Sequence, residues 1–185
     1  MELLWPSTES LDSYIAALEQ GWSPNTFRPD VSGIQLKAVN ANPEAFLESM
    51  VDREGKGAPI RGADGVSRAR LPGFVKWMWD GEFCGSINLR WQPGTADLPS
   101  YVGGHVGYSV VPWKQGNGYA SEALRQMLPL AKAEGLPHID ATTEIDNIAS
   151  QRVLEKNGGS VVKRIRHIDL TTGKLEMFLY RIPLG

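Results

Sequence analysis

The chain has 185 residues, a formal net charge of -2, 42% hydrophobic residues and 22% charged residues. This composition fits one globular domain over residues 1–185. It offers no bulk attraction to nucleic acid or anionic lipid, and no apolar run approaches the roughly 20 residues of a membrane helix. Cys84 has no partner for an intramolecular disulfide and the first residues lack a secretion signal, so we expect a cytoplasmic protein with a small-molecule site.

The first part of the chain predicts a strand and two helices. Residues 2–5 are typical of a short strand that Pro6 ends. Apolar residues at i, i+3, i+4 and i+7 between positions 11 and 18 predict an amphipathic helix, which Gly21 closes. Asn42 followed by Pro43 indicates a second helix start, and Gly55 follows that helix.

A loop and a hairpin come next. Residues 55–73 are rich in Gly, Pro and Arg without periodicity, which predicts a long mobile loop that is either plain surface or part of a substrate site. Asp80-Gly81 separates two apolar and aromatic runs, 74–79 and 82–91. This pattern predicts a β-hairpin with a primed turn.

Residues 104–120 predict a strand, a glycine-bearing loop and the start of a helix over 118–134, in which Pro129 should produce a local kink. A strand over 138–143 follows, and then a helix that Asn147 caps and Gly158-Gly159 stops. Two last strands cover 161–170 and 174–182. The order of elements indicates a mixed α/β (α+β) layer structure.

The loop before the helix at 118 has the chemistry of a phosphate cradle. A helix N-terminus presents unpaired N–H groups and a partial positive charge. Gly116 and Gly118 allow a close backbone approach. A Gly-Asn-Gly sequence alone fits a tight turn equally well. Neither a Rossmann glycine fingerprint nor a Walker Gly-Lys-Ser/Thr sequence is present.

Two stretches together resemble a known family. Residues 115–120, Gln-Gly-Asn-Gly-Tyr-Ala, match the Gln/Arg-x-x-Gly-x-Gly/Ala motif of the GCN5-related N-acetyltransferases (GNAT) at every defined position. Residues 146–159 resemble the family's second helix, with Asn147 and Ser150 in the Asn-x-x-Ser form of the ribosomal-protein N-terminal acetyltransferase branch. The resemblance is sharpest over the core motifs at 100–160.

The resemblance implies a mixed, mostly antiparallel central sheet flanked by helices, and the use of acetyl-coenzyme A without a metal. It implies acetyl transfer to a primary amine, of a small molecule or a peptide N-terminus, by direct attack on the thioester. The alternative is a non-catalytic acyl-coenzyme A binding domain with the same fold. The resemblance places the cofactor on Val110, Val111, Gln115, Gly116, Asn117, Gly118, Tyr119, Ala120 and Asn147.

The resemblance also suggests catalytic residues. Many members use a tyrosine to protonate the leaving thiolate, at a position where this chain has Leu154. Ser150 is then the candidate proton donor or, alternatively, a routine partner in the helix cap. His105, at the start of the strand beside the acetyl site, and Asp169, near the last turn, are the alternative general bases. The other interpretation of His105 is a hydrogen-bonded structural histidine, and that of Asp169 is a solvent-facing residue at a strand end. The sequence does not identify the acceptor, and it is compatible with a homodimer.

Overall fold

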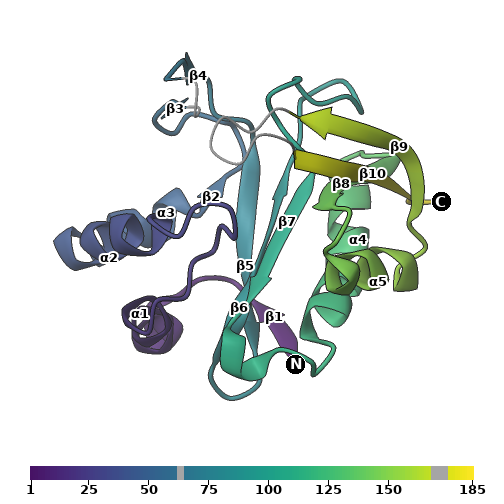
Figure 1. Cartoon of the computed structure of the whole chain (residues 1–185). Helices are drawn as coiled ribbons and strands as arrows, with labels where there is room; N and C mark the ends of the chain where they lie inside the picture. The colour runs from purple at the N-terminus through teal and green to yellow at the C-terminus, as the bar shows by residue number, and fades with distance from the viewer. Residues whose placement is uncertain (62–64, 168–174) are drawn as a thin grey trace.

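The computed structural model describes the chain except residues 62–64 and 168–174, and it does not describe the side chains of 61, 166, 167 and 175. In the described part, two antiparallel sheets lie next to each other (Figure 1). The first contains β1 (Glu2–Leu4), β5 (Gly73–Trp79), β6 (Phe83–Arg90) and β7 (Val106–Val110) in that order, with β2 (Val51–Asp52) also paired to β5. The second has the order β8 (His138–Glu144), β10 (Leu175–Pro183), β9 (Ser160–His167).

Helices cover the first sheet on both faces. On one side lie α1 (Leu11–Glu19), α2 (Val31–Ala41) and α3 (Pro43–Ser49); on the other lies α4 (Tyr119–Ala133), with α5 (Ile148–Lys156) packed beside it next to the second sheet (Figure 1). Two short 3-10 helices, η1 (Thr8–Ser10) and η2 (Pro112–Lys114), precede α1 and α4. The architecture confirms the predicted mixed α/β class with mostly antiparallel strands and flanking helices.

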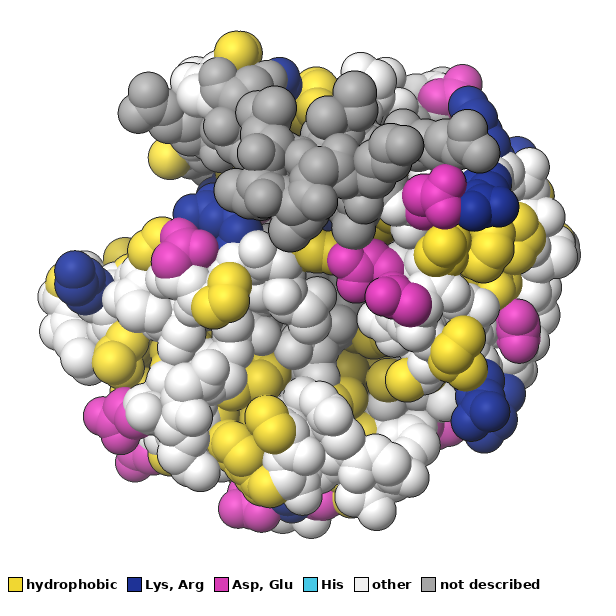
Figure 2. Space-filling view, viewed as in Figure 1, with side chains coloured by type: hydrophobic (Ala, Val, Ile, Leu, Met, Phe, Trp, Pro, Cys, Tyr) yellow, Lys and Arg dark blue, Asp and Glu magenta, His cyan; other side chains and the backbone are white. Residues whose placement is uncertain are grey.

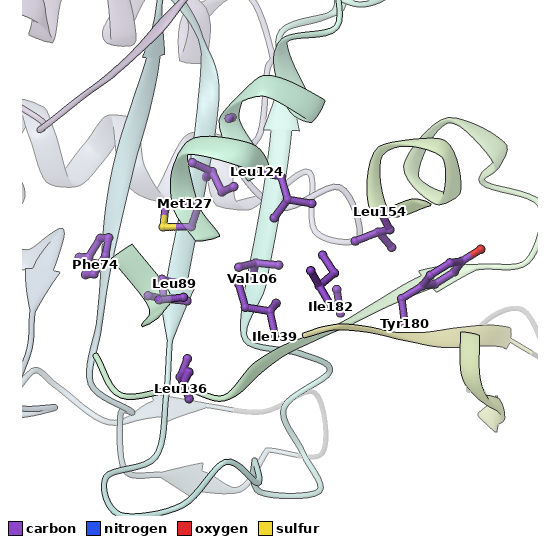
Figure 3. Close-up of a cluster of buried hydrophobic side chains, with 14 of the residues drawn as sticks. Phe74, Leu89, Val106, Leu124, Met127, Leu136, Ile139, Leu154, Tyr180 and Ile182 are labelled. Carbon is purple, nitrogen blue, oxygen red and sulfur yellow. The ribbon is translucent and has the colours of Figure 1, made fainter. Parts of the chain in front are cut away.

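Each helical layer has its own core. Between α4, α5 and the sheets, the buried cluster contains Leu89, Val106, Leu124, Met127, Leu154 and Ile182 (Figure 3). Under α1 to α3, a second cluster centres on Tyr14, which stacks on Trp77 with ring centroids 4.5 Å apart. The two clusters lie on opposite faces of the first sheet because side chains alternate along each strand.

The predicted local signals are confirmed at several boundaries. Asn42 Oδ1 accepts a hydrogen bond from Ala45 N (3.0 Å), with Pro43 in the first turn of α3. Gly21, with φ of 84°, follows α1. Gly158, with φ of 83°, follows α5. These caps depend on neighbouring residues, which is why the sequence predicts them.

Other predictions need correction. The sequence signalled no helix over 31–41, where α2 lies; it packs on α1 with few buried residues of its own. The loop at 55–73 contains two short paired strands, β3 (Ile60–Arg61) and β4 (Ser67–Arg68). The hairpin turn has three residues rather than two, because a register shift at Met78/Trp79 pairs Trp79 with Phe83. Among the described residues, no helix has the length and apolarity needed to cross a membrane.

Candidate active site

The two sheets meet at one point and then separate. His105 N–H donates to Asp140 O (2.7 Å), at the start of β7 and near the start of β8. Gly104 allows this approach, because a Cβ there would lie 2.8 Å from Ala141 Cα. Beyond this contact β7 pairs with β6 and β8 pairs with β10. Beyond this contact, none of the described strands pairs with the second edge of β7.

The register shows which residues face this open edge. Val111 N–H donates to Cys84 O (2.9 Å), so Val111 turns its N–H toward β6. Because hydrogen-bonded and non-hydrogen-bonded pairs alternate in an antiparallel ladder, Tyr108 and Val110 turn their backbone groups away from β6. The Val110 carbonyl accepts a hydrogen bond from Gln115 Nε2 (3.3 Å). The open edge thus begins beside the glycine loop.

The loop at 115–118 presents the N-terminus of α4 to open space. Gly116 and Gly118 have φ of 83° and 76°, and a Cβ on either would meet no atom within 4 Å. Gly118 is the N-cap, and the structure shows no side chain capping the helix there. The first N–H groups of α4 are therefore available to an anion in the space that these glycines leave clear.

The carboxylate of Asp80, in the hairpin turn, binds one residue on each side of the loop at 115–118. Its carboxylate accepts hydrogen bonds from Lys114 Nζ (2.7 Å) and from Tyr119 OH (2.6 Å). Lys114 also pairs with Glu82 (2.7 Å). These bonds, first that of Lys114, hold the pKa of Asp80 well below its usual range. Lys114 is thus engaged within the protein rather than free to reach a ligand.

Across the gap from β7, the first turn of α5 carries Asn147 and Ser150. Asn147 Oδ1 caps the helix by accepting from Ser150 N (3.0 Å). Ser150 Oγ lies 2.8 Å from Tyr108 OH. Burial raises the pKa of Tyr108 to about 12, so this phenol keeps its proton at neutral pH. The sequence did not predict this contact between Tyr108 and Ser150, because it joins residues 42 positions apart.

The two predicted bases lie apart from this pair. The His105 side chain is fully buried, and its Nδ1 accepts from Asp140 N (2.9 Å). Nε2 has no partner among the described residues, and the ring packs on His138. Burial is the main cause that lowers the pKa of His105. Asp169 lies outside the described residues.

A cavity of ≈ 520 Å³ opens on the face of the first sheet that carries α1 and α2. Ser86, Asn88 and Arg90 of β6 line it, together with residues 24–27 of the α1–α2 connection and residues 101–103. Tyr108 belongs to the lining, whereas His105 does not. Figure 2 shows a hollow near the centre of the face viewed in Figure 1. No group of three or more potential metal ligands occurs among the described residues.

Comparison with known proteins places these features in context. Residues 35–160 match the acetyltransferase (GNAT) domain. None of the curated proteins matches the chain. A GNAT-family acetyltransferase from Streptococcus pneumoniae superposes with a TM-score of 0.62 and 16% identity over 100% of each chain. The ribosomal L7/L12 alpha-N-protein acetyltransferase RimL, with coenzyme A, gives 0.65 and 12% over 98% of this chain and 92% of its own. YncA, a putative acetyltransferase from Salmonella typhimurium with acetyl-CoA, gives 0.56 and 16% over 100% and 94%.

Proposed function

Because the chain belongs to the GNAT acetyltransferase family, it is an acetyl-coenzyme A-dependent N-acetyltransferase, and we propose which of its residues hold the cofactor and move protons. When bound, acetyl-coenzyme A supplies an acetyl group on a thioester, whose thiolate leaves on transfer to an amine. We assign residues 1–185 to one domain with this activity.

The cofactor site that we propose consists of backbone groups. The pyrophosphate fits the α4 N-terminus, because no atom of the described residues occupies the space where a Cβ on Gly116 or Gly118 would lie. Backbone groups of Tyr108 and Val110 bind the pantetheine arm along the open edge. We propose no backbone contact between Val111 and the cofactor, unlike the prediction from the sequence, because the Val111 N–H donates to Cys84 O and its carbonyl accepts from Lys114 N (3.0 Å).

Asn147 completes the cofactor site from α5. Its Oδ1 is engaged by the helix cap, which leaves the Nδ2 amide to donate across the gap toward β7. Gln115, Asn117, Tyr119 and Ala120 stay in the proposed set through their backbone positions in the loop and first turn. The Asn117 side chain itself donates to Lys114 O (3.1 Å), which holds the loop closed.

For the proton donor we propose Ser150, supported by Tyr108. Ser150 Oγ faces β7 across the gap and holds a proton there. Tyr108 OH lies 2.8 Å from Ser150 Oγ and is protonated at neutral pH because its pKa is raised to about 12. It can donate its proton to Ser150 Oγ as the serine gives its own to the thiolate, and Tyr108 then regains a proton from solvent, which receives the proton that the amine loses. Positioning supplies much of the rate in such a site, so a weak acid is sufficient.

The general base is proposed outside the described residues. His105 is fully buried and away from the cavity, so proton uptake there requires a path that no described contact supplies. Asp169 therefore remains the proposed base, on the family resemblance alone. Comparing pH–rate profiles of Asp169→Asn and His105→Gln tests it: the base variant loses the ascending limb of kcat/KM, and a shift in His105→Gln alone would contradict the assignment.

The acceptor that we propose is a primary amine, of a small molecule or a peptide N-terminus. The Asn147 and Ser150 pattern and the fold shared with RimL support a relation to the ribosomal-protein branch. A homodimer and a cytoplasmic location also stay proposals; Val161 and Val162 on β9, 47% and 50% exposed, offer a surface for the former.

The observation that carries the proposal is the open edge of β7, which joins the clear space at the α4 N-terminus to Ser150. Release of coenzyme A thiol from acetyl-coenzyme A, with a panel of amines, tests it directly. Amine-dependent release is expected. Tight cofactor binding without release on any amine would leave only the non-catalytic alternative, which no described feature favours.

A further inference from the structure

The cavity beside β7 contains an imbalance of charge. Three charged side chains occur among its described lining residues: Asp52, Arg70 and Arg90. Asp52 is satisfied within the protein, because its oxygens accept from Gly57 N (2.8 Å) and Lys56 N (2.9 Å). These hydrogen bonds, first that of Gly57, and the nearby Arg70 lower the pKa of Asp52. Asp52 and Arg70 offset each other, which leaves the charge of Arg90.

Arg90 is partly buried at the end of β6, and its hydrogen bonds among the described residues go to uncharged groups. Its Nε donates to Gly104 O (2.6 Å) and its Nη1 to Asn88 Oδ1 (3.4 Å). No carboxylate of the described residues pairs with it, and burial lowers its pKa. A guanidinium has five N–H donors, so several remain free. Buried charges are normally paired, and a cation left unpaired beside a cavity points to an anion from outside the chain.

Arg90 lies close to the open edge of β7. Ser86, Asn88 and Arg90 alternate on β6 and share the cavity face, with Asn88 opposite Gly107 of β7. Arg90 Nη2 lies 3.9 Å from where a Cβ on Gly107 would be, and Gly107 has none. Tyr108 is the next residue, about 3.3 Å further along the strand; its side chain points to the opposite face, toward Ser150, and its backbone groups face the open edge. An anion on Arg90 and an amine at Tyr108 are thus separated by the length of a short molecule.

We propose that the acceptor is a short amino acid, whose carboxylate binds Arg90 while its amine reaches the open edge of β7 at Tyr108. The planar guanidinium suits a carboxylate, which can accept two parallel hydrogen bonds. Asn88 positions Arg90 through its Oδ1. This inference rests on the proposed acetyltransferase function and adds the class of its acceptor.

The wild-type enzyme provides the first test. Glycine, β-alanine and 4-aminobutanoate are compared with amino alcohols of the same length, which keep the amine and replace the carboxylate with a hydroxyl. Thiol release gives kcat/KM for each pair. We expect at least one acid to exceed its alcohol by about 10- to 100-fold, the range for a hydrogen-bonded charge. Equal turnover within every pair would overturn the inference and leave the acetyltransferase function intact.

Substitution then assigns the preference to Arg90. Arg90→Gln is expected to bring the ratio of acid to alcohol close to one. Arg125→Gln removes the same charge from the exposed surface of α4, where Arg125 pairs with Glu122, and should keep the wild-type ratio. A wild-type ratio retained in Arg90→Gln would contradict the assignment.

Two measurements separate failure of this inference from other failures. Coenzyme A affinity, by calorimetry, reports whether Arg90→Gln still folds after loss of the Gly104 hydrogen bond. If it does not fold, the wild-type ratios decide the proposal alone. No thiol release with any acid or alcohol, while another amine of the panel gives release, would overturn this inference and leave the proposed function intact. No release with any amine, in an enzyme that binds coenzyme A, would overturn both.

Discussion

The cofactor half of the site presents backbone groups to its ligand, whereas the acceptor half presents side chains. Around α4 and the edge of β7, the groups that face the ligand are backbone N–H and C=O groups, and glycines keep the space clear. In the cavity, the corresponding groups are side chains such as Asn88 and Arg90. A backbone site keeps its ligand when most of the surrounding side chains change, apart from the glycines. A side-chain site can change its ligand by single substitutions, so the two halves should respond differently to mutation.

The largest expected effect is at the backbone cradle. Gly118→Val places a branched side chain at φ of 76° and in the space in front of the helix, so we expect coenzyme A affinity to fall by about 100-fold or more. Calorimetry measures it. Gly135→Val is the matched control, because Gly135 has φ of 85° and equally open surroundings at the other end of α4. Equal losses in both variants would show that strain alone is responsible.

Ser150→Ala tests the proton donor at the boundary between the two halves. We expect kcat to fall by about 100-fold, in the lower range for loss of an acid catalyst, with coenzyme A affinity unchanged. Steady-state kinetics and calorimetry separate the two. Unchanged turnover would remove Ser150 from the mechanism and leave it as part of the α5 cap.

Tyr108→Phe should have a smaller effect, a loss in kcat of about 10-fold, because the phenol acts through Ser150. The double variant Ser150→Ala, Tyr108→Phe is expected to be no slower than Ser150→Ala alone, since the two hydroxyls form one chain. Additive losses in the double variant would mean that Tyr108 contributes independently.

The smallest effect concerns His105, whose pKa is lowered mainly by burial. Below about pH 6.5 the His105 imidazole is protonated in the unfolded chain but stays neutral in the folded protein until the pH reaches its lowered pKa. The free energy of unfolding therefore falls as pH decreases from about 6.5 through the folded pKa. His105→Gln, which can still accept from Asp140 N, should weaken this fall in urea denaturation at pH 5 to 8. A fall as steep as in the wild type would contradict a buried, neutral His105.

The same contrast explains what the sequence could predict. Gln115 to Ala120 and the Asn147 cap are local patterns, so their residues identify both the structure and its ligand. The contacts of Tyr108 with Ser150 and of His105 with Asp140 join residues 42 and 35 positions apart. These contacts depend on where β7 and β8 separate, and residue spacing in the sequence does not predict that point. Arg90 lies within the run 82–91, for which the sequence predicts only a strand.

Asp80 links the two halves, because it sits in the turn of the hairpin whose second strand ends at Arg90. Through Lys114 and Tyr119 the same carboxylate fastens this turn to the loop before α4. The cofactor cradle and the acceptor cation therefore lie at opposite ends of one strand, about 23 Å long at 3.3 Å per residue. Together with the pairing of β6 and β7, this one carboxylate holds the cradle against the strand that carries the acceptor cation, so both substrates are positioned from the same hairpin.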